Sequence, residues 1–241
     1  MSLRQAVSTG LPRLWLCAMA VFCIGGREVA GQITAIKAQK QNKNRVSVYI
    51  DGEYRFSLGL LAAAPLGRGD TLTDQQIEEL LTQDAVEMAY DRTLKYLAYR
   101  PRSGAEVVRY LGQKGVAPEI QDRVLERLRA ASLVDDAAFA RFWVENRESF
   151  RPQGRRLLRQ ELRQKGISEA LIQEVLSRVD EGRSAYAAAA QRAARYGHLS
   201  DEAFRQKIYG YLRRRGFDYD VVAETTARLL TERGEGAARG S

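Results

Sequence analysis

The sequence predicts a mainly α-helical protein, built from three tandem three-helix repeats that follow a small N-terminal β-hairpin domain. A six-residue pattern of Leu, two mostly polar residues, a basic residue, Gly and an apolar residue occurs three times. The copies are LGQKGV from Leu111, LRQKGI from Leu162 and LRRRGF from Leu212. Their glycines lie 51 and 50 residues apart, a period typical of stacked supersecondary units. Ahead of the repeats, apolar and polar residues alternate as they do in strands.

Composition limits the classes of function. The 241 residues are 45% hydrophobic, enough for a substantial core. The formal net charge of +8 favours anionic partners such as nucleic acid or an acidic protein surface. Cys17 and Cys23 are the only cysteines and His198 is the only histidine, which argues against a disulfide framework, a thiolate metal site and a His-based triad. We expect a surface loop position for His198, and no cofactor, metal or catalytic residue.

Residues 1–31 form a leader of doubtful status. Two arginines precede an apolar run, 14–24, which has the outline of a secretory signal peptide and is too short to span a bilayer. The rest of the chain is free of cysteine and rich in Lys and Arg, which is typical of the cytosol. We therefore favour a later native start, at Met19 or around Val29, over secretion, and expect a cytoplasmic protein without membrane contact.

Residues 32–72 are expected to form the small β-domain. Three segments have the period of two that half-buried strands show: 33–38, 46–50 and 54–58. Asp51-Gly52 separates the second and third segments and is a strong hairpin signal. Such a small sheet is stable only when it packs on something else. Thr73 to Gln76 then has the pattern of a capping box and opens a linking helix, 73–88.

Three helical repeats are expected to follow, over 89–132, 133–180 and 181–232, with a disordered tail at 233–241. In the first repeat, Pro101 ends one helix, Ser103 to Glu106 is a capping box, and Pro118 suits the first turn of a third helix.

The other two repeats follow the same plan. Asp135 is expected to cap the first helix of the second repeat, 155–165 to form its second helix and Ser168 to cap its third. Asp218 is expected to cap the last helix of the third repeat, which should end near Leu230. Gly115, Gly166 and Gly216 should each take the left-handed conformation that closes a helix.

Laid out in this way, the chain resembles the RecX family of recombinase regulators. The resemblance rests on YLAYRPRSGAEVVRYL, LVDDAAFARFWVENR and RPQGRRLLRQELRQKGIS, at 96–111, 133–147 and 151–168, and it covers roughly 89–230. The hairpin region looks like the extra β-domain of a subset of the family, whereas residues 1–31 match nothing in it. The resemblance implies a curved, monomeric, non-enzymatic array that binds the RecA filament on single- or double-stranded DNA. It also implies inhibition of RecA ATPase and strand exchange, with roles in homologous recombination, DNA repair and the SOS response.

The densest charge lies between Arg151 and Lys165, with six basic residues and one acid. Arg155, Arg159 and Arg163 recur every four residues and so share one helix face, where like charges repel by a few tenths of a kcal/mol per pair. The equivalent helices of the other repeats are also basic, and the resulting surface is expected to contact DNA phosphates or an acidic recombinase surface. It comprises Arg151, Arg155, Arg156, Arg159, Arg163, Lys165, Arg109, Lys114, Arg213, Arg214 and Arg215. A solvated basic face is the alternative.

Two further groups have structural and functional interpretations. Phe139, Phe142 and Trp143 could stack on bases, but their helical spacing favours a place in the core. On the hairpin, three aromatic residues lie near four basic ones, which suggests a secondary contact with nucleic acid or filament. These residues are Tyr49, Tyr54 and Phe56, with Lys37, Lys40, Lys43 and Arg45.

A second function remains open from the sequence alone: a DNA-binding protein with helix-turn-helix-like units that acts on duplex DNA directly. Short helices joined by tight glycine turns suit it. No single repeat, however, offers a recognition helix with Asn, Gln and Arg at base-reading positions. An enzyme such as a nuclease ranks third, because the chain lacks histidines and acidic clusters; Asp135-Asp136 is better explained as a helix cap.

Overall fold

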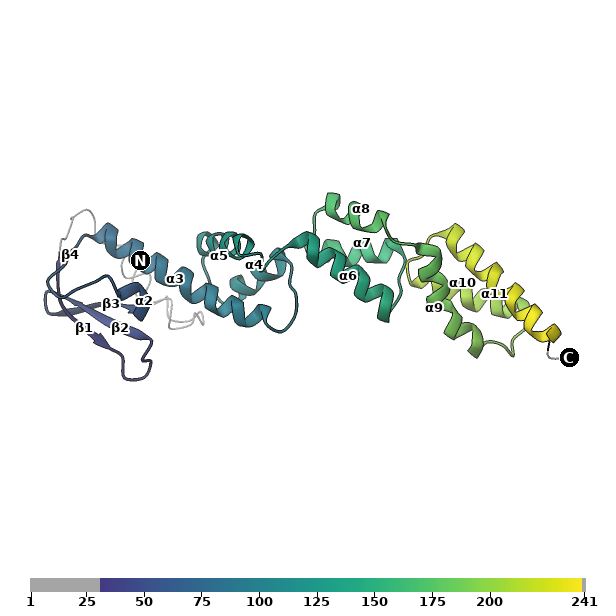
Figure 1. The fold of residues 1–241 in the computed structure, drawn as a ribbon, viewed down its shortest axis with the longest axis horizontal. Helices are drawn as coiled ribbons and strands as arrows, with labels where there is room; N and C mark the ends of the chain where they lie inside the picture. The colour runs from purple at the N-terminus through teal and green to yellow at the C-terminus, as the bar shows by residue number, and fades with distance from the viewer. Residues whose placement is uncertain (1–30, 240–241) are drawn as a thin grey trace, which may run out of the picture. The chain divides into compact units, whose positions relative to one another are not determined.

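The computed structural model describes residues 31–239, and side chains through residue 235. The chain divides into two compact units, residues 1–84 and 85–241. The predicted leader lies outside the described residues, apart from Gly31. Figure 1 shows a small sheet in the first unit and groups of helices in the second. Over 31–239, no helix is both long and apolar enough to cross a membrane.

The first unit holds an antiparallel sheet of four strands in the order β3-β2-β1-β4. The strands are β1 (Gly31–Ala38), β2 (Arg45–Ile50), β3 (Glu53–Gly59) and β4 (Thr71–Leu72). At the β2–β3 turn, Asp51 and Gly52 have φ angles of 51° and 89°, the two positive values that a type I′ hairpin turn requires. The predicted hairpin is thus confirmed. β4 was not expected, because two residues are too few to show a period.

The sheet packs on two helices, α2 (Leu60–Ala63) and the start of α3 (Asp74–Leu97). Thr73 and Gln76 form the predicted capping box, each side chain bonding the other's backbone N–H at 3.2 and 2.9 Å. The buried Asp84 carboxylate accepts a hydrogen bond from the Gly59 N–H at 2.6 Å and pairs with Arg45 at 2.9 Å. One helix, α3, covers both the predicted linking helix and the first helix of the first repeat, with no break near residue 88.

The second unit contains the three repeats, each with its own apolar core, which confirms the predicted fold class. After α3, the first repeat has α4 (Gly104–Gln113) and α5 (Pro118–Ala130). The second has α6 (Asp136–Phe150), α7 (Arg155–Gln164) and α8 (Glu169–Ser177). The third has α9 (Glu181–Arg195), α10 (Asp201–Arg214) and α11 (Tyr219–Arg239). The side chains of Ser103, Asp135 and Ser168 cap their helices as expected.

The six-residue repeat is the sequence of a Schellman turn that ends each middle helix. Gly115, Gly166 and Gly216 have φ angles of 73°, 77° and 82°. In every copy the apolar residue after the glycine donates its N–H to the carbonyl of the Leu that opens the pattern, at 3.1, 3.1 and 3.4 Å. The predicted left-handed glycines are therefore confirmed.

The middle helix of the third repeat differs from the other two. In the first two repeats the residue that caps the middle helix, Ser103 or Gly154, lies 12 residues before the turn glycine. In the third repeat Phe204 takes this place, buried inside α10, and the helix begins one turn earlier, with Ser200 as its N-cap. The third repeat thus has a different helix start.

Two expectations are wrong. Phe142 is 42% exposed and does not belong to the core, whereas Phe139 is buried and Trp143 packs against the same core. α11 runs to Arg239, so most of the predicted disordered tail, 233–241, is helical. A helix that is already formed gains one hydrogen bond for each added residue, which offsets the low helix propensity of the glycines there.

The turn glycines allow a matched test of packing. Gly115→Ala should lower the free energy of unfolding by about 1–2 kcal/mol, through left-handed strain alone, because nothing lies within 4 Å of a Cβ at that position. Gly166→Ala should lower the free energy of unfolding by about 1–3 kcal/mol more than Gly115→Ala does, because its Cβ would overlap the Ala105 side chain in the neighbouring repeat. Urea unfolding of both variants measures the difference. Equal losses would contradict the close contact between repeats.

Candidate partner and DNA interface

The middle helices of neighbouring repeats are joined head to tail. Ser103, the N-cap of α4, donates its hydroxyl to the Lys165 carbonyl at the end of α7, at 2.6 Å. In the same way, Gly154, the N-cap of α7, donates its N–H to the Arg215 carbonyl at the end of α10, at 2.9 Å. A helix has a partial positive charge at its N-terminus and a partial negative charge at its C-terminus, so each junction places opposite charges together. In the second and third copies, the basic residue of the repeated pattern therefore stands at a repeat junction.

An acidic residue completes each junction. Asp136, the first residue of α6, accepts a hydrogen bond from the Gly104 N–H at 2.8 Å. Glu181, the first residue of α9, accepts one from the Arg155 N–H at 3.1 Å. Both N–H groups lie in the first turn of a middle helix, where no helical partner exists. Asp135 caps its own helix, α6, as predicted. Its neighbour Asp136 instead caps α4, in the preceding repeat.

The absence of side chains at the turn glycines permits this approach. A Cβ at Gly216 would lie 2.6 Å from the Leu157 Cβ, and one at Gly154 would overlap the Gly216 backbone. Arg215 also reaches across the junction and donates to the Pro152 carbonyl at 3.0 Å. The second junction is thus built from backbone contacts that only glycine allows.

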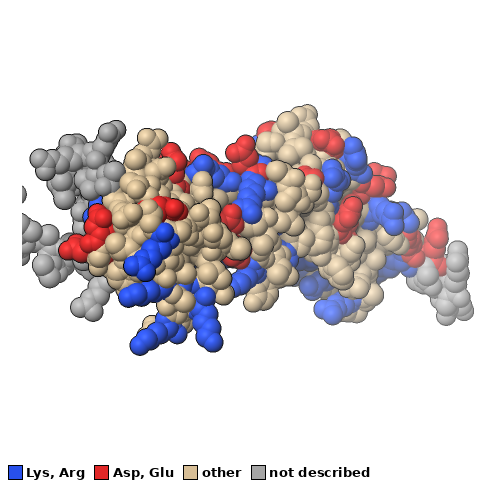
Figure 2. Space-filling view, turned by 60° about the vertical axis from the view of Figure 1, so that its left-hand side comes forward, with Lys and Arg blue, Asp and Glu red and all other residues tan. Residues whose placement is uncertain are grey.

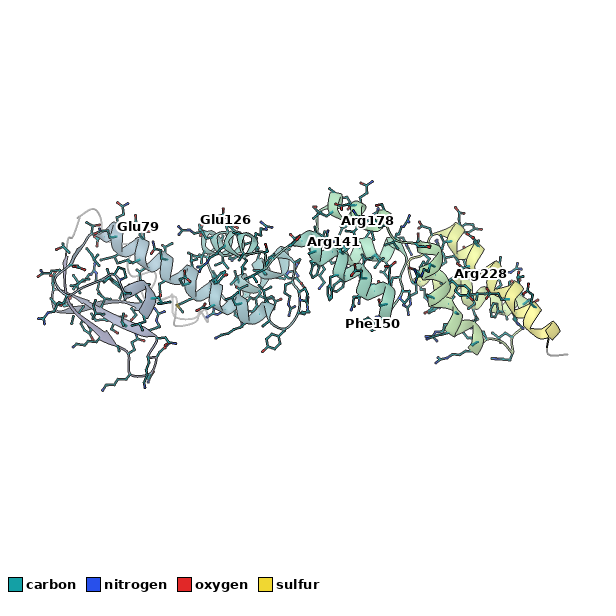
Figure 3. The ribbon with its side chains drawn as sticks, in the orientation of Figure 1. Glu79, Glu126, Arg141, Phe150, Arg178 and Arg228 are labelled. Atoms are coloured by element: carbon teal, nitrogen blue, oxygen red, sulfur yellow. The ribbon has the colours of Figure 1, made fainter. Side chains whose placement is uncertain are left out.

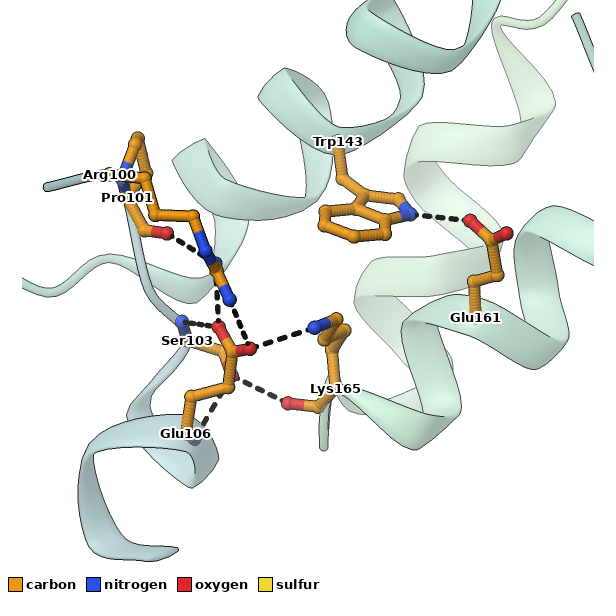
Figure 4. A network of polar contacts seen from close by, with 7 residues as sticks. All are labelled: Arg100, Pro101, Ser103, Glu106, Trp143, Glu161 and Lys165. Atoms are coloured by element: carbon orange, nitrogen blue, oxygen red, sulfur yellow. Dashed lines mark hydrogen bonds and ion pairs between the residues drawn. The ribbon is translucent and has the colours of Figure 1, made fainter. Parts of the chain in front are cut away.

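Glu106 holds the first junction through a buried ionic network, shown in Figure 4. Its carboxylate pairs with Arg100 at 2.8 Å and with Lys165 of the next repeat at 2.7 Å. Burial alone would raise the Glu106 pKa, but the hydrogen bonds from Arg100 and Lys165 outweigh it and lower the pKa from 4.5 to about 2. The carboxylate therefore stays ionised and binds two cations.

Lys165 also faces Trp143, whose ring centre lies 4.8 Å from its ammonium group. The Trp143 indole N–H donates to Glu161 at 2.8 Å, as Figure 4 shows. Glu161 also pairs with Arg147 at 2.8 Å. Burial would raise the Glu161 pKa, but hydrogen bonds from Arg147 and Trp143 lower it overall. Lys165 is thus held on both sides, by a carboxylate and by an aromatic ring.

Glu181 has the opposite electrostatic balance. Its carboxylate is buried, and burial raises its pKa despite hydrogen bonds from the Arg155 and Asp218 N–H groups. The nearest contact with the Arg155 guanidinium is long, 3.9 Å. The second junction therefore rests on neutral contacts more than on charge.

The three arginines that share one face of α7, Arg155, Arg159 and Arg163, form a basic stripe, and each has an acidic partner within the chain. Glu169, at the start of α8, contacts Arg159 at 3.3 Å and Arg163 at 2.8 Å. The hydrogen bond from Arg163 lowers the Glu169 pKa. Arg155 donates to the Val179 carbonyl at 2.6 Å, besides its contact with Glu181. Neighbouring helices thus reduce the repulsion along this face without any bound anion.

The other predicted interface residues fall into two groups. Arg156 bonds the Arg213 carbonyl at 3.2 Å, and Lys114 lies over the Tyr110 ring. Four arginines are exposed and make no ion pair with any residue that the structure describes: Arg109, Arg151, Arg213 and Arg214. Among the predicted interface residues, these four are therefore accessible to a partner without loss of an ion pair to a described residue. Figure 2 shows acidic and basic side chains intermixed over much of one face.

The hairpin residues are also divided. Arg45 is committed to Asp84, and Lys37 lies 4.8 Å from the Tyr49 ring centre. Lys40 and Lys43 are exposed. Of the three aromatic residues, Phe56 is buried, whereas Tyr54 is 57% exposed.

Two exposed aromatic residues were not predicted from the sequence. Tyr99 and Phe150 are 86% and 83% exposed, and each precedes an Arg-Pro pair at the same place in its repeat. Figure 3 shows Phe150 extending from the end of α6 away from the helices. Their shared spacing from the turn glycine, 16 residues, was the signal available in the sequence.

The Glu106 network gives a pH-dependent prediction. Glu106→Gln should lower the free energy of unfolding at pH 7, by on the order of 3 kcal/mol at most, since the shift from 4.5 to about 2 sets the limit. The folded-state pKa is the lower one, so the contribution is present above about pH 4.5 and disappears as the pH falls toward 2. Unfolding measured against pH for both proteins should converge at low pH.

Glu181→Gln is the matched control, because this carboxylate is equally buried but its pKa is raised. Its loss of stability at pH 7 should be much smaller than that of Glu106→Gln. A parallel pH dependence in the two variants would contradict the difference between the junctions.

Comparison with known proteins places these features in one family. Four family models match in order: the regulatory protein RecX N-terminal domain at 31–71, and the first, second and third RecX three-helix domains at 89–128, 135–176 and 180–225. The regulatory protein RecX of Bacillus licheniformis is 34% identical over 212 residues, 86% of this chain and 81% of the relative. That of Bacillus subtilis is 31% identical over 208 residues, 84% and 79% of the two chains.

Solved structures agree. A crystal structure of regulatory protein RecX matches with a TM-score of 0.66 and 30% identity, covering 82% of this chain and 99% of that one. The structure of RecX from Lactobacillus salivarius has a TM-score of 0.56 and 23% identity, over 61% and 97% of the chains, and supports the fold. The sheet, the three repeats and these relatives lead to one conclusion: the chain belongs to the RecX family of regulatory proteins.

Proposed function

We propose that this protein is a non-catalytic regulator that binds a RecA-type recombinase filament on DNA and restrains its ATP hydrolysis and strand exchange. The observation that carries the proposal is that this chain contains all four RecX parts in order and is similar over most of its length to relatives named regulatory proteins. In this proposal the protein acts in the cytoplasm, as a monomer and without a cofactor.

The four exposed arginines are the proposed first contacts. Arg109, Arg151, Arg213 and Arg214 can meet a phosphate or a carboxylate without breaking an ion pair with any residue that the structure describes. An anion that approaches Arg159 or Arg163 must instead compete with Glu169. In this proposal, Arg155, Arg159 and Arg163 therefore contribute less to direct contact than the four exposed arginines. Their charges act mainly by adding to the electrostatic potential that attracts an anionic partner.

A pair of charge-matched variants tests the proposal. One variant replaces Arg109, Arg151, Arg213 and Arg214 with Ala, and the control replaces four other exposed arginines of the helical unit. These are Arg123, Arg141, Arg195 and Arg205. The first variant should bind a nucleotide-locked recombinase filament on the order of tenfold more weakly than the control, with a smaller salt dependence, because local contacts add to net charge. Fluorescence anisotropy across a salt series measures both.

The unmodified protein should also slow filament ATP hydrolysis, and the control variant should keep this effect. If both variants lose binding equally, only net charge matters and the assigned surface is wrong. If the protein binds bare duplex DNA as tightly as the filament, and with sequence preference, direct DNA binding replaces the proposed regulation.

A further inference from the structure

The turn after α4, Lys114–Gly115–Val116, is the one copy of the repeated turn that receives no helix start from another repeat in the described part of the chain. At Gly166 a Cβ would overlap Ala105, and at Gly216 it would lie 2.6 Å from Leu157. At Gly115 nothing lies within 4 Å. The same six-residue pattern is thus present three times but used for packing twice.

The residues beside Gly115 show the same difference. Lys114 is exposed, whereas its counterpart Lys165 is largely covered and holds Glu106. No described residue donates a hydrogen bond to the Lys114 carbonyl, although the Lys165 and Arg215 carbonyls each accept one across a junction. Val116 is half-buried, whereas its counterparts Ile167 and Phe217 are buried. The first turn therefore has a carbonyl that accepts no hydrogen bond from a described residue, a cation that lies over the Tyr110 ring but forms no ion pair with a described residue, and a partly exposed apolar side chain.

We propose that this turn, residues 114–116, is a docking site for the N-terminus of a helix on the partner protein. The two internal junctions identify the chemistry of the occupant, because in both of them the same turn receives a helix N-terminus. The partner helix would begin with a Ser or Gly N-cap that donates to the Lys114 carbonyl. A Glu at its third position would pair with Lys114, as Glu106 pairs with Lys165. The identity of the partner as a recombinase rests on the function proposed above.

A second copy of this chain does not fit the same site. The middle helix whose start receives no turn from a described residue is α10, whose N-cap is Ser200 and whose third residue is Ala203, so it lacks the third-position Glu that would pair with Lys114. The two acids of its first turn, Asp201 and Glu202, already contact Arg233 and Gln206. The place that Ser103 and Gly154 occupy in the other repeats is filled by Phe204, inside the helix and beneath Arg233. The occupant is therefore a helix from another protein.

The acid of the internal junctions is absent here. Asp136 lies 30 residues before Gly166, and the residue 30 before Gly115 is Ala85, within α3. The partner helix would be held through its cap and its third residue alone. Binding should then depend strongly on Lys114.

Cross-linking and charge reversal together test the proposal. The full-length protein with p-benzoylphenylalanine in place of the exposed Gln113 is mixed with recombinase filament and irradiated, and the cross-linked peptides are mapped by mass spectrometry. The expected product joins residue 113 to the first turn of a recombinase helix. In parallel, Lys114→Glu should weaken filament binding on the order of tenfold, whereas Lys207→Glu, at an exposed lysine of α10, should change it less than twofold.

The outcomes separate the inference from the proposed function. A filament complex that forms without this cross-link, or that is insensitive to Lys114→Glu, overturns the docking site and leaves the regulator intact. A cross-link to a second copy or to residues 1–30 of the same chain identifies another occupant and overturns it as well. If no filament complex forms with the unmodified protein, the proposed function fails and the inference fails with it.

Discussion

The rest of the helical unit depends on one interaction, the hydrogen-bonded junction between repeats. In each junction, the C-terminal end of one middle helix contacts the N-terminus of the middle helix in the preceding repeat. Each helix end alone would leave polar backbone groups without partners. The carbonyls of Lys165 and Arg215 accept hydrogen bonds from the Ser103 hydroxyl and the Gly154 N–H of the preceding repeat. The first N–H groups of α4 and α7 donate to Asp136 and Glu181 of the following repeat, so these groups are satisfied only when neighbouring repeats are in place. The repeats therefore stabilise each other through their backbones, and the apolar cores remain separate within each repeat.

This constraint changes the meaning of the recurring basic residue. A charge that returns at a fixed position in every repeat suggests one common ligand. In the structure its three copies have three environments: Lys165 lies between Glu106 and Trp143, Arg215 bonds the Pro152 carbonyl, and Lys114 is exposed. In two of the three copies the basic residue packs at a repeat junction, so its recurrence does not require a common ligand. Partner contacts are better sought among cations that packing leaves exposed.

The features that the sequence predicted are those set by neighbouring residues. The hairpin turn at Asp51-Gly52, the capping boxes and the three left-handed glycines that close the middle helices each depend on a few consecutive residues, and all were correctly predicted. The contacts of the candidate site depend on residues from different helices. Helix periodicity describes one helix at a time, so it could not show that Glu169 of α8 contacts Arg159 and Arg163 of α7. Nor could it show that Asp136 of α6 accepts a hydrogen bond from the first turn of α4. The basic stripe was therefore visible in the sequence, but its acidic partners were not.

Because α10 begins one turn earlier than the other middle helices, a further repeat can be added at some positions of the array and not at others. A duplicated copy of the second repeat could be inserted next to the original. The glycine turn of its middle helix would fit the helix start in the repeat before it, and its own helix start would fit the turn in the repeat after it. A copy added after α11 would find Phe204 where it needs a capping Ser or Gly. Gene duplication can thus lengthen such a chain from within but not at this end. A designed longer version would have to keep the third repeat last.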